Sequence, residues 1–191
     1  MSATNRGSKR RESDFYETPH DVVHDFLEDH FKGKYKVILE PCCGSGNMVR
    51  VLREHFPEST IIAQDILPVA PIRQANVTHC ESDFLTEPAL STPVDLIFTN
   101  PPYSIAEKVI RKALMTYPDA TVVMLLRLDF LGSQERFEFW KRHPVNCIYP
   151  LACRPSFTGD GGTDSNNYAW FVWYPGRTDQ RIIPTWGRAT F

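Results

Sequence analysis

Apolar and polar positions divide the chain into short apolar runs and longer stretches with helical spacing. The apolar runs, rich in β-branched and aromatic side chains, predict strands at residues 36–39, 60–63, 77–80, 94–99, 120–126, 146–151 and 168–173. Apolar residues that recur every three or four positions predict helices at residues 20–30, 48–55, 105–116 and 134–142. Strands and helices alternate through most of the chain, which favours an open α/β sheet.

Composition limits the class of protein further. A chain of 191 residues with 42% hydrophobic residues fits one globular domain. No apolar run approaches the roughly 20 residues that span a bilayer, so no membrane insertion is expected. The polar, basic N-terminus does not resemble a secretory signal, and we expect a cytoplasmic protein of a bacterial or phage-infected cell. The sequence leaves the oligomeric state open.

The charge distribution suggests where the domain begins and ends. Residues 1–13 form a basic arm ahead of an acidic remainder, and such an arm can follow a phosphate backbone or act as a solubilising tail. We expect the folded domain at residues 14–175 and a C-terminal tail at residues 176–191, which can contact nucleic acid or cap the sheet. The loop at residues 154–167 is long and rich in flexible residues, and is either functional or disordered.

Cysteine and histidine spacing gives no metal site. Five cysteines, an odd number with no C-x-x-C pair, fit neither a disulfide framework nor structural zinc, and reduced thiols are expected. His20 and His24 stand four positions apart and can share a helix face, but no third ligand is close in sequence. A solvated helix face is the preferred interpretation, and no metal is expected.

A glycine-rich turn follows the first predicted strand. Its sequence is Glu40-Pro41-Cys42-Cys43-Gly44-Ser45-Gly46-Asn47, and glycines at positions 44 and 46 allow the backbone to approach a ligand closely. A dinucleotide fold would place Gly or Ala where this chain has Val49. Glu40 would repel a pyrophosphate and attract an amine, so the expected ligand is a nucleoside that carries an amino acid.

Acidic residues also end the next two predicted strands. Asp65 lies 19 positions beyond Gly46, where a carboxylate can accept both ribose hydroxyls, although a simple turn Asp is the alternative. Asp83 and Phe84 can accept from an adenine amine and cover its ring. Acids at the carboxyl ends of successive strands are typical of the ligand crevice of an open α/β sheet.

The turn Asn100-Pro101-Pro102-Tyr103 follows the apolar strand at residues 94–99. Two prolines fix φ and remove two backbone donors, which leaves a stiff turn rich in hydrogen-bond acceptors beside an aromatic ring. Taken alone, this turn is either an ordinary connection or a catalytic platform.

Four motifs in this order resemble those of S-adenosylmethionine-dependent adenine-N6 DNA methyltransferases of the Asn-Pro-Pro-Tyr type. The motifs are Tyr16-Glu17-Thr18-Pro19, residues 38–46, Ser82-Asp83-Phe84-Leu85 and Asn100-Pro101-Pro102-Tyr103, and the resemblance covers roughly residues 14–115. It implies a Rossmann-like, seven-stranded, mostly parallel sheet with one antiparallel strand and helices on both faces.

The resemblance also implies roles for individual residues. Tyr16 and Thr18 flank the methionine end of the cofactor, and Asn100 also lies against the cofactor. Glu40, Pro41, Cys42, Gly44 and Gly46 approach its amino acid. Asp65 and Ile66 take the ribose, and Asp83 and Phe84 the adenine. Thr18 is also well placed as the N-cap of the helix at residues 20–30.

The chemistry of adenine methylation explains the residue types of the turn. The N6 lone pair is delocalised into the ring, so acceptors at Asn100 Oδ1 and the Pro101 carbonyl would draw the two N–H hydrogens and free that pair, while Tyr103 stacks on the base. A base inside a duplex must be flipped out first. Cytosine-C5 chemistry would need a Pro-Cys nucleophile at this turn, and the only Pro-Cys is Pro41-Cys42.

The remaining residues leave the substrate partly open. Phe157 lies where relatives often place an aromatic that covers the flipped base, and Arg154 can hold a phosphate; an exposed loop with a docking Phe is the alternative. The expected partner is DNA. RNA bases, a protein glutamine amide and a non-catalytic cofactor-binding subunit stay as alternatives.

Overall fold

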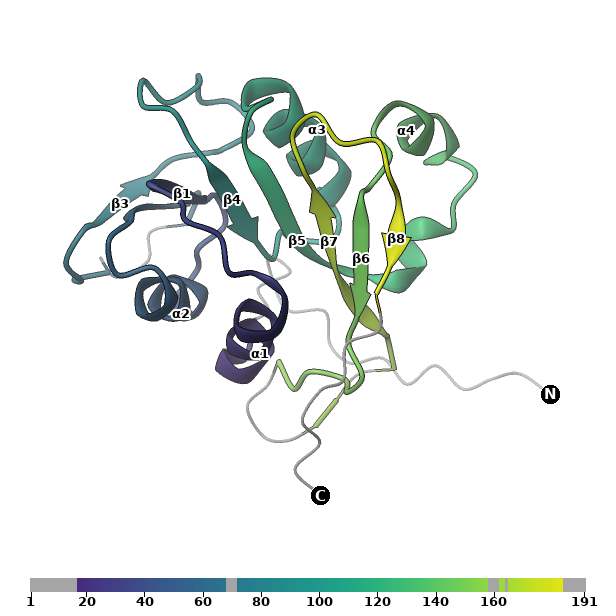
Figure 1. Cartoon of the computed structure of the whole chain (residues 1–191), viewed down its shortest axis with the longest axis horizontal. Coiled ribbons are helices and arrows are strands. Elements are labelled where there is room, and N and C mark those ends of the chain that lie inside the picture. Colours follow the sequence, from purple (N-terminus) through teal and green to yellow (C-terminus); the bar gives the residue numbers. More distant parts are fainter. Residues whose placement is uncertain (1–16, 68–71, 158–161, 164, 184–191) are drawn as a thin grey trace.

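A computed structural model describes residues 17–67, 72–157, 162–163 and 165–183. The described chain forms one eight-stranded sheet in the order β3-β2-β1-β4-β5-β7-β6-β8 (Figure 1). The strands are β1 (Val37–Glu40), β2 (Thr60–Asp65), β3 (Val77–Glu81), β4 (Leu96–Thr99), β5 (Thr121–Arg127), β6 (Cys147–Pro150), β7 (Tyr168–Trp173) and β8 (Arg181–Ile182). The chain order reverses beside β1, and this reversal places the carboxyl ends of β1, β2 and β4 next to one another.

The strand directions follow the expected pattern, with one addition. β7 pairs antiparallel with both β5 and β6, while the other pairs are parallel. The expectation that residues 168–173 form the antiparallel strand is therefore confirmed. The expected number of seven strands is wrong by one, because Arg181 and Ile182, placed in the C-terminal tail by the sequence, pair with β6 as an edge strand.

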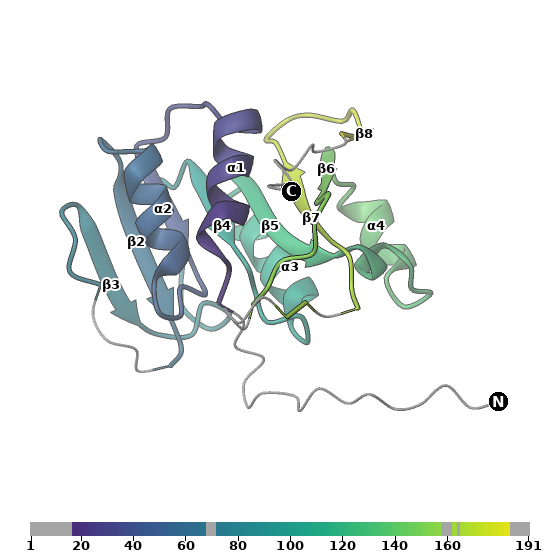
Figure 2. The same ribbon diagram turned by 90° about the horizontal axis from the view of Figure 1, so that it is seen from below.

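Helices cover both faces of the sheet (Figures 1 and 2). α1 (His20–His30) and α2 (Asn47–His55) pack on one face, and α3 (Ala106–Thr116) and α4 (Phe137–Arg142) on the other. Successive strand residues point to opposite faces, so Ile38 joins the first core and Leu39 the second. Because both faces are covered, the central strands are apolar at nearly every position.

Two local expectations differ from the structure. The helix expected at residues 134–142 begins at Phe137, after a turn in which Arg136 N donates to the Ser133 carbonyl. Thr18 does not cap α1, because Pro19 occupies the N-cap position and no side chain caps this helix end. No helix in the described ranges is long and apolar enough to cross a membrane.

Candidate functional site

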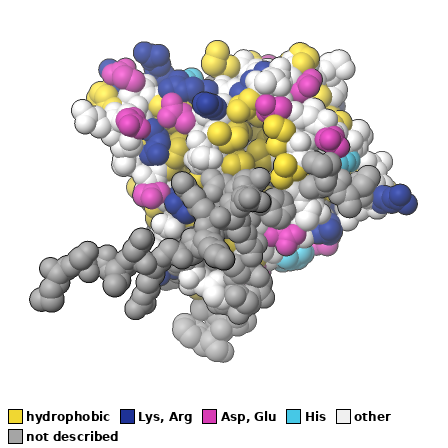
Figure 3. Space-filling model, turned by 180° about the vertical axis from the view of Figure 1, so that it is seen from behind, with side chains coloured by type: hydrophobic (Ala, Val, Ile, Leu, Met, Phe, Trp, Pro, Cys, Tyr) yellow, Lys and Arg dark blue, Asp and Glu magenta, His cyan; other side chains and the backbone are white. Residues whose placement is uncertain are grey.

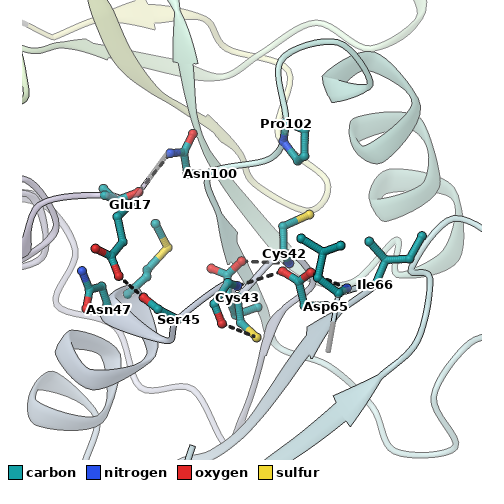
Figure 4. A pocket seen from close by; sticks show the side chains of 14 residues that line it. Glu17, Cys42, Cys43, Ser45, Asn47, Asp65, Ile66, Asn100 and Pro102 are labelled. Carbon is teal, nitrogen blue, oxygen red and sulfur yellow. Dashed lines mark hydrogen bonds between the residues drawn. The ribbon is translucent and has the colours of Figure 1, made fainter. Parts of the chain in front are cut away.

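A cavity of about 350 Å³ opens at the carboxyl ends of β1, β2 and β4 (Figure 4). It is lined by Glu17, Thr18, Glu40, Cys42, Cys43, Gly44, Ser45, Asn47, Met48, Asp65, Ile66, Leu67, Asn100 and Pro102. Asn100 and Pro102 lie on one side, and Cys43 and Asp65 on the other. Three carboxylates and no Lys or Arg occur in the described lining, so the cavity favours a ligand with positive charge.

Glu40 is the most constrained of the three carboxylates. Its side chain is 1% exposed at the end of β1. Oε1 accepts hydrogen bonds from Thr99 Oγ1 at 2.6 Å and from the Cys42 backbone N–H at 3.0 Å. Oε2 is buried without a hydrogen-bond partner among the described residues. A buried, unpaired carboxylate oxygen in a cavity wall is a strong acceptor for a ligand N–H.

The same burial changes the acidity of Glu40. Burial raises its pKa to about 8, the bonds from Thr99 and Cys42 oppose this rise, and the nearby Asp65 charge adds to it. An ammonium group beside Oε2 would favour the carboxylate form and lower the pKa again.

Asp65 holds the glycine turn in place. Its Oδ2 accepts from the Gly44 backbone N–H at 2.8 Å and its Oδ1 from the Leu67 N–H at 2.9 Å. Gly44 lines the cavity and has φ +49°, whereas Gly46 has φ +83° and does not belong to the described lining. A Cβ on Gly46 would lie 2.5 Å from Ile72 Cδ1, so this glycine is required for packing of the turn.

The Asn-Pro-Pro-Tyr turn contributes Asn100 and Pro102 to the cavity. Asn100 Nδ2 donates to Thr18 Oγ1 at 3.0 Å, which joins residues 82 positions apart in the chain. With Nδ2 donating to Thr18, the other polar atom of the amide, Oδ1, is an acceptor. The neighbouring Glu17 accepts a hydrogen bond from Ser45 Oγ in the glycine turn (Figure 4). Because Thr18 lines the cavity and accepts from Asn100, it is a residue of the site.

Tyr103 and Phe157 meet around Tyr168 beside the cavity. The Tyr103 and Phe157 rings lie 5.8 Å and 5.0 Å from the Tyr168 ring, and the Arg127 guanidinium lies 4.9 Å from the Tyr103 ring centroid. Phe157 is buried in this position, whereas Arg154 is exposed and donates to Asn167 Oδ1 at 3.3 Å. The structure thus brings Phe157 to the same ring, Tyr168, that Tyr103 of the Asn-Pro-Pro-Tyr turn contacts. Arg154 stays on the surface and does not join this aromatic group.

Asp83 and Phe84 lie apart from this group. Neither belongs to the described lining of the main cavity; Asp83 Oδ1 accepts from the Leu85 N–H at 2.9 Å. Phe84 is buried against the α3 side of the core and lines a second cavity of about 300 Å³. Pro41 and Pro101 also lie outside the described lining, and Tyr16 falls outside the described residues.

The Pro41-Cys42 pair does not supply a ready nucleophile. Burial raises the pKa of the Cys42 thiol well above its usual value, and the Glu40 and Asp65 charges add to this rise. The thiol is therefore protonated at neutral pH, and a protonated thiol is a weak nucleophile.

Thr99 is the site residue that the sequence pattern missed. It is fully buried at the end of β4, next to the end of β1, because Ile38 and Leu39 pair with Leu96 and Ile97. Only the adjacency of β1 and β4 brings its hydroxyl to Glu40. In an open α/β sheet whose strand order reverses beside β1, β1 is expected to pair with β4. That expected pairing is the signal that could have identified Thr99.

Comparison with known sequences gives short matches. No protein-family model matches the chain. An uncharacterised protein of Mycoplasma pneumoniae is 36% identical over 77 residues, which are 36% of this chain and 17% of that protein. Its counterpart in Mycoplasma genitalium is 28% identical over 113 residues. The aligned segments span only 17% and 25% of these two relatives.

Comparison with solved structures gives longer matches. A type I restriction-modification methyltransferase subunit from Streptococcus thermophilus matches 88% of this chain and 47% of its own, with TM-score 0.62 and 15% identity. A dimethyladenosine transferase from Plasmodium falciparum matches 84% of this chain and 63% of its own, with TM-score 0.61 and 15% identity. A putative RNA methyltransferase from Pyrococcus horikoshii matches 85% of this chain and 87% of its own, with TM-score 0.56 and 12% identity. The chain therefore has the Rossmann-like fold of class I S-adenosylmethionine-dependent methyltransferases.

Proposed function

We propose that the chain transfers a methyl group from S-adenosylmethionine to the N6 amine of adenine in DNA. The observation that carries this proposal is that Glu40 and Asn100 line one cavity. Glu40 offers a buried acceptor for a cationic cofactor, and Asn100 offers an acceptor for the amine of the substrate. A methyl transfer needs both partners within one small volume.

The residues of the cavity fit this cofactor. Glu40 Oε2 would accept from its ammonium group, and Asp65, which the sequence predicts as a ribose contact, lines the same cavity. The first turn of α2, which begins at Asn47 beside the cavity, offers backbone N–H groups to its carboxylate. A sulfonium cation adds positive charge that an acidic cavity favours. A pyrophosphate would be repelled by the same carboxylates.

When bound, S-adenosylmethionine supplies an electrophilic methyl group on a sulfonium sulfur. The acceptors at Asn100 Oδ1 and the Pro101 carbonyl would draw the two N6 hydrogens of adenine and make the nitrogen lone pair available. The freed pair would then be able to accept the methyl group, and one of the two N6 protons would pass to solvent water. The hydrogen bond from Asn100 Nδ2 to Thr18 Oγ1 would keep the amide oriented with Oδ1 as the acceptor.

A flipped base would lie over Tyr103, within reach of the aromatic group around Tyr168. Stacking on an aromatic side chain contributes about 1–3 kcal/mol per base. Phe157 would have to leave its buried position to cover the opposite side of the base. We therefore expect the Phe157 side chain to move when substrate binds.

Support for DNA comes from the fold neighbours and from the motif order, not from surface charge. Several structures with this fold are subunits of restriction-modification systems. On the described part of the face opposite to Figure 1, Lys and Arg alternate with Asp and Glu (Figure 3). This face presents mixed charge, so its charge does not distinguish DNA from RNA or protein as the substrate.

The test is incorporation of labelled methyl groups from S-adenosylmethionine into unmethylated DNA. The full chain should methylate adenine N6, and Asn100→Ala should lower the rate on the order of a hundredfold, in line with the loss of one preorganised polar contact. Asn100→Asp keeps an oxygen acceptor and is the matched variant. Undiminished turnover in Asn100→Ala would refute the proposed mechanism.

RNA and protein substrates belong in the same assay. Methylation of RNA alone would refute DNA as the substrate and would indicate an RNA methyltransferase, an activity named for one structure with this fold. Cofactor binding in calorimetry without turnover on DNA, RNA or protein would instead indicate a non-catalytic subunit.

A further inference from the structure

Three histidines gather where α1 packs against α2, on the face of the sheet shown in Figure 2. The His24 ring lies 5.7 Å from the His20 ring and 5.0 Å from the His55 ring, measured between centroids. Glu28 joins them from α1, and its Oε1 lies 3.4 Å from His55 Nδ1. His20, His24 and Glu28 are spaced by four positions, so all three lie on one side of α1.

The donor atoms of this cluster are close enough for a metal ion. One atom each from His24, Glu28 and His55 lie within 4.8 Å of one another. Zinc bonds of 2.0–2.1 Å in a tetrahedron place neighbouring ligand atoms about 3.3 Å apart. The His55–Glu28 distance already meets this requirement, and the half-exposed His24 side chain would have to turn to close the remaining gap.

The surroundings of the cluster also favour a cation. Glu54 Oε2 lies 3.1 Å from His20 Nε2, and Asp25 Oδ1 lies 3.5 Å from His24 Nδ1. Carboxylates that contact the imidazole of a ligating histidine fix its orientation and raise its basicity. No Lys or Arg side chain forms an ion pair with these groups among the described residues.

We propose that His24, Glu28 and His55 bind one divalent transition-metal ion such as Zn²⁺. Two imidazoles and one carboxylate are a ligand set that zinc accepts. The ion fastens α1 to α2. Because α1 follows Thr18 and α2 begins at Asn47, both of which line the cavity, the ion also stabilises the wall of the main site. This site is independent of the methyl-transfer reaction.

The experiment is a titration of the full chain with Zn²⁺, followed by calorimetry and by thermal unfolding. One ion per chain should bind and raise the melting temperature. His24→Gln and Glu28→Gln, at half-exposed or exposed side chains, should each weaken Zn²⁺ affinity by at least about tenfold. His143→Gln, a histidine of α4's C-terminal end outside the cluster, is the matched control and should bind as the wild type does.

Co²⁺ in place of Zn²⁺ separates this site from the cysteines. Ligation by His and Glu gives no thiolate-to-cobalt charge-transfer absorption, whereas binding at Cys42 or Cys153 does. Failure to bind Zn²⁺ at a one-to-one ratio overturns the proposal. Binding that shows thiolate absorption, or that persists in His24→Gln and Glu28→Gln, also overturns it.

Discussion

Glu40→Gln removes one of the three ionisable carboxyl groups of the main cavity while it keeps the shape of the side chain. Burial raises the pKa of Glu40 to about 8 from 4.5. A carboxyl group with a raised pKa holds its proton more tightly in the folded state than in the unfolded chain. Its contribution to stability is therefore fully present below pH 4.5 and is lost as the pH rises through about 8.

The size of this effect follows from the two pKa values. At about 1.36 kcal/mol for each pKa unit between 4.5 and about 8, ionisation of Glu40 costs the folded state roughly 5 kcal/mol. Gln keeps an oxygen that accepts from Thr99 and Cys42, and it never ionises. We expect the free energy of unfolding of the variant, relative to the wild type, to increase by roughly 4 kcal/mol from pH 5 to pH 9, because part of the effect already occurs below pH 5.

The assay is urea unfolding at several pH values without cofactor. The buried amide donors of Gln cost the variant about 1–3 kcal/mol of stability at every pH. The test therefore compares how the difference in free energy of unfolding between variant and wild type changes with pH, not its size at one pH. Glu107→Gln, on α3 away from the cavity, is the matched control and should give a difference that does not vary in this way. A pH-independent difference for Glu40→Gln would refute the reasoning.

Cofactor binding gives a second measurement of the same carboxyl group. Under the proposed function, the ammonium of S-adenosylmethionine would pair with Glu40, which below pH 8 would first have to lose its proton, so binding would release a proton. Calorimetry in two buffers with different ionisation enthalpies detects this release. Glu40→Gln should bind the cofactor weakly and release no proton, although it is the more stable protein at high pH.

Three further substitutions test neighbouring contacts. Thr99→Val removes a bond that lowers the pKa of Glu40, so the pH profile of cofactor binding should move to higher pH; an unchanged profile contradicts this role. Thr18→Val should lower kcat by up to about tenfold, because the Asn100 amide loses one neutral hydrogen bond, and Thr18→Ser should restore it. Gly46→Ala should destabilise the fold by about 1–2 kcal/mol in urea unfolding, since φ is +83° there; an unaltered midpoint would exclude this cost.

The sequence predicted what depends on neighbours in the chain. Apolar runs identified seven strands, and the central ones gave the clearest pattern, because strands covered on both faces are apolar at nearly every position. Glu40 and Asp65 could be placed close together, because each stands at the carboxyl end of a strand and β1 and β2 run parallel. The eighth strand was missed because a two-residue edge strand leaves no pattern.

The contacts that the sequence did not predict are between distant residues. Thr18 was expected as a helix cap because its hydroxyl precedes a helix, yet that hydroxyl accepts from Asn100. His20 and His24 were interpreted as a solvated helix face because no third ligand is near in sequence, whereas the packing of α1 on α2 brings His55 beside them. Helix packing is decided by the tertiary fold, which local spacing does not encode.

The short segment before α1 connects the two halves of the main site. Glu17 accepts from Ser45 in the glycine turn, and the next residue, Thr18, accepts from Asn100 in the Asn-Pro-Pro-Tyr turn. A shift of α1 would therefore loosen both turns together. The proposed ion, by fixing α1 on α2, would also restrain this segment, because α1 begins at His20, two residues beyond Thr18. Zn²⁺ should consequently slow hydrogen exchange at both turns in the wild type and leave exchange unaltered in His24→Gln.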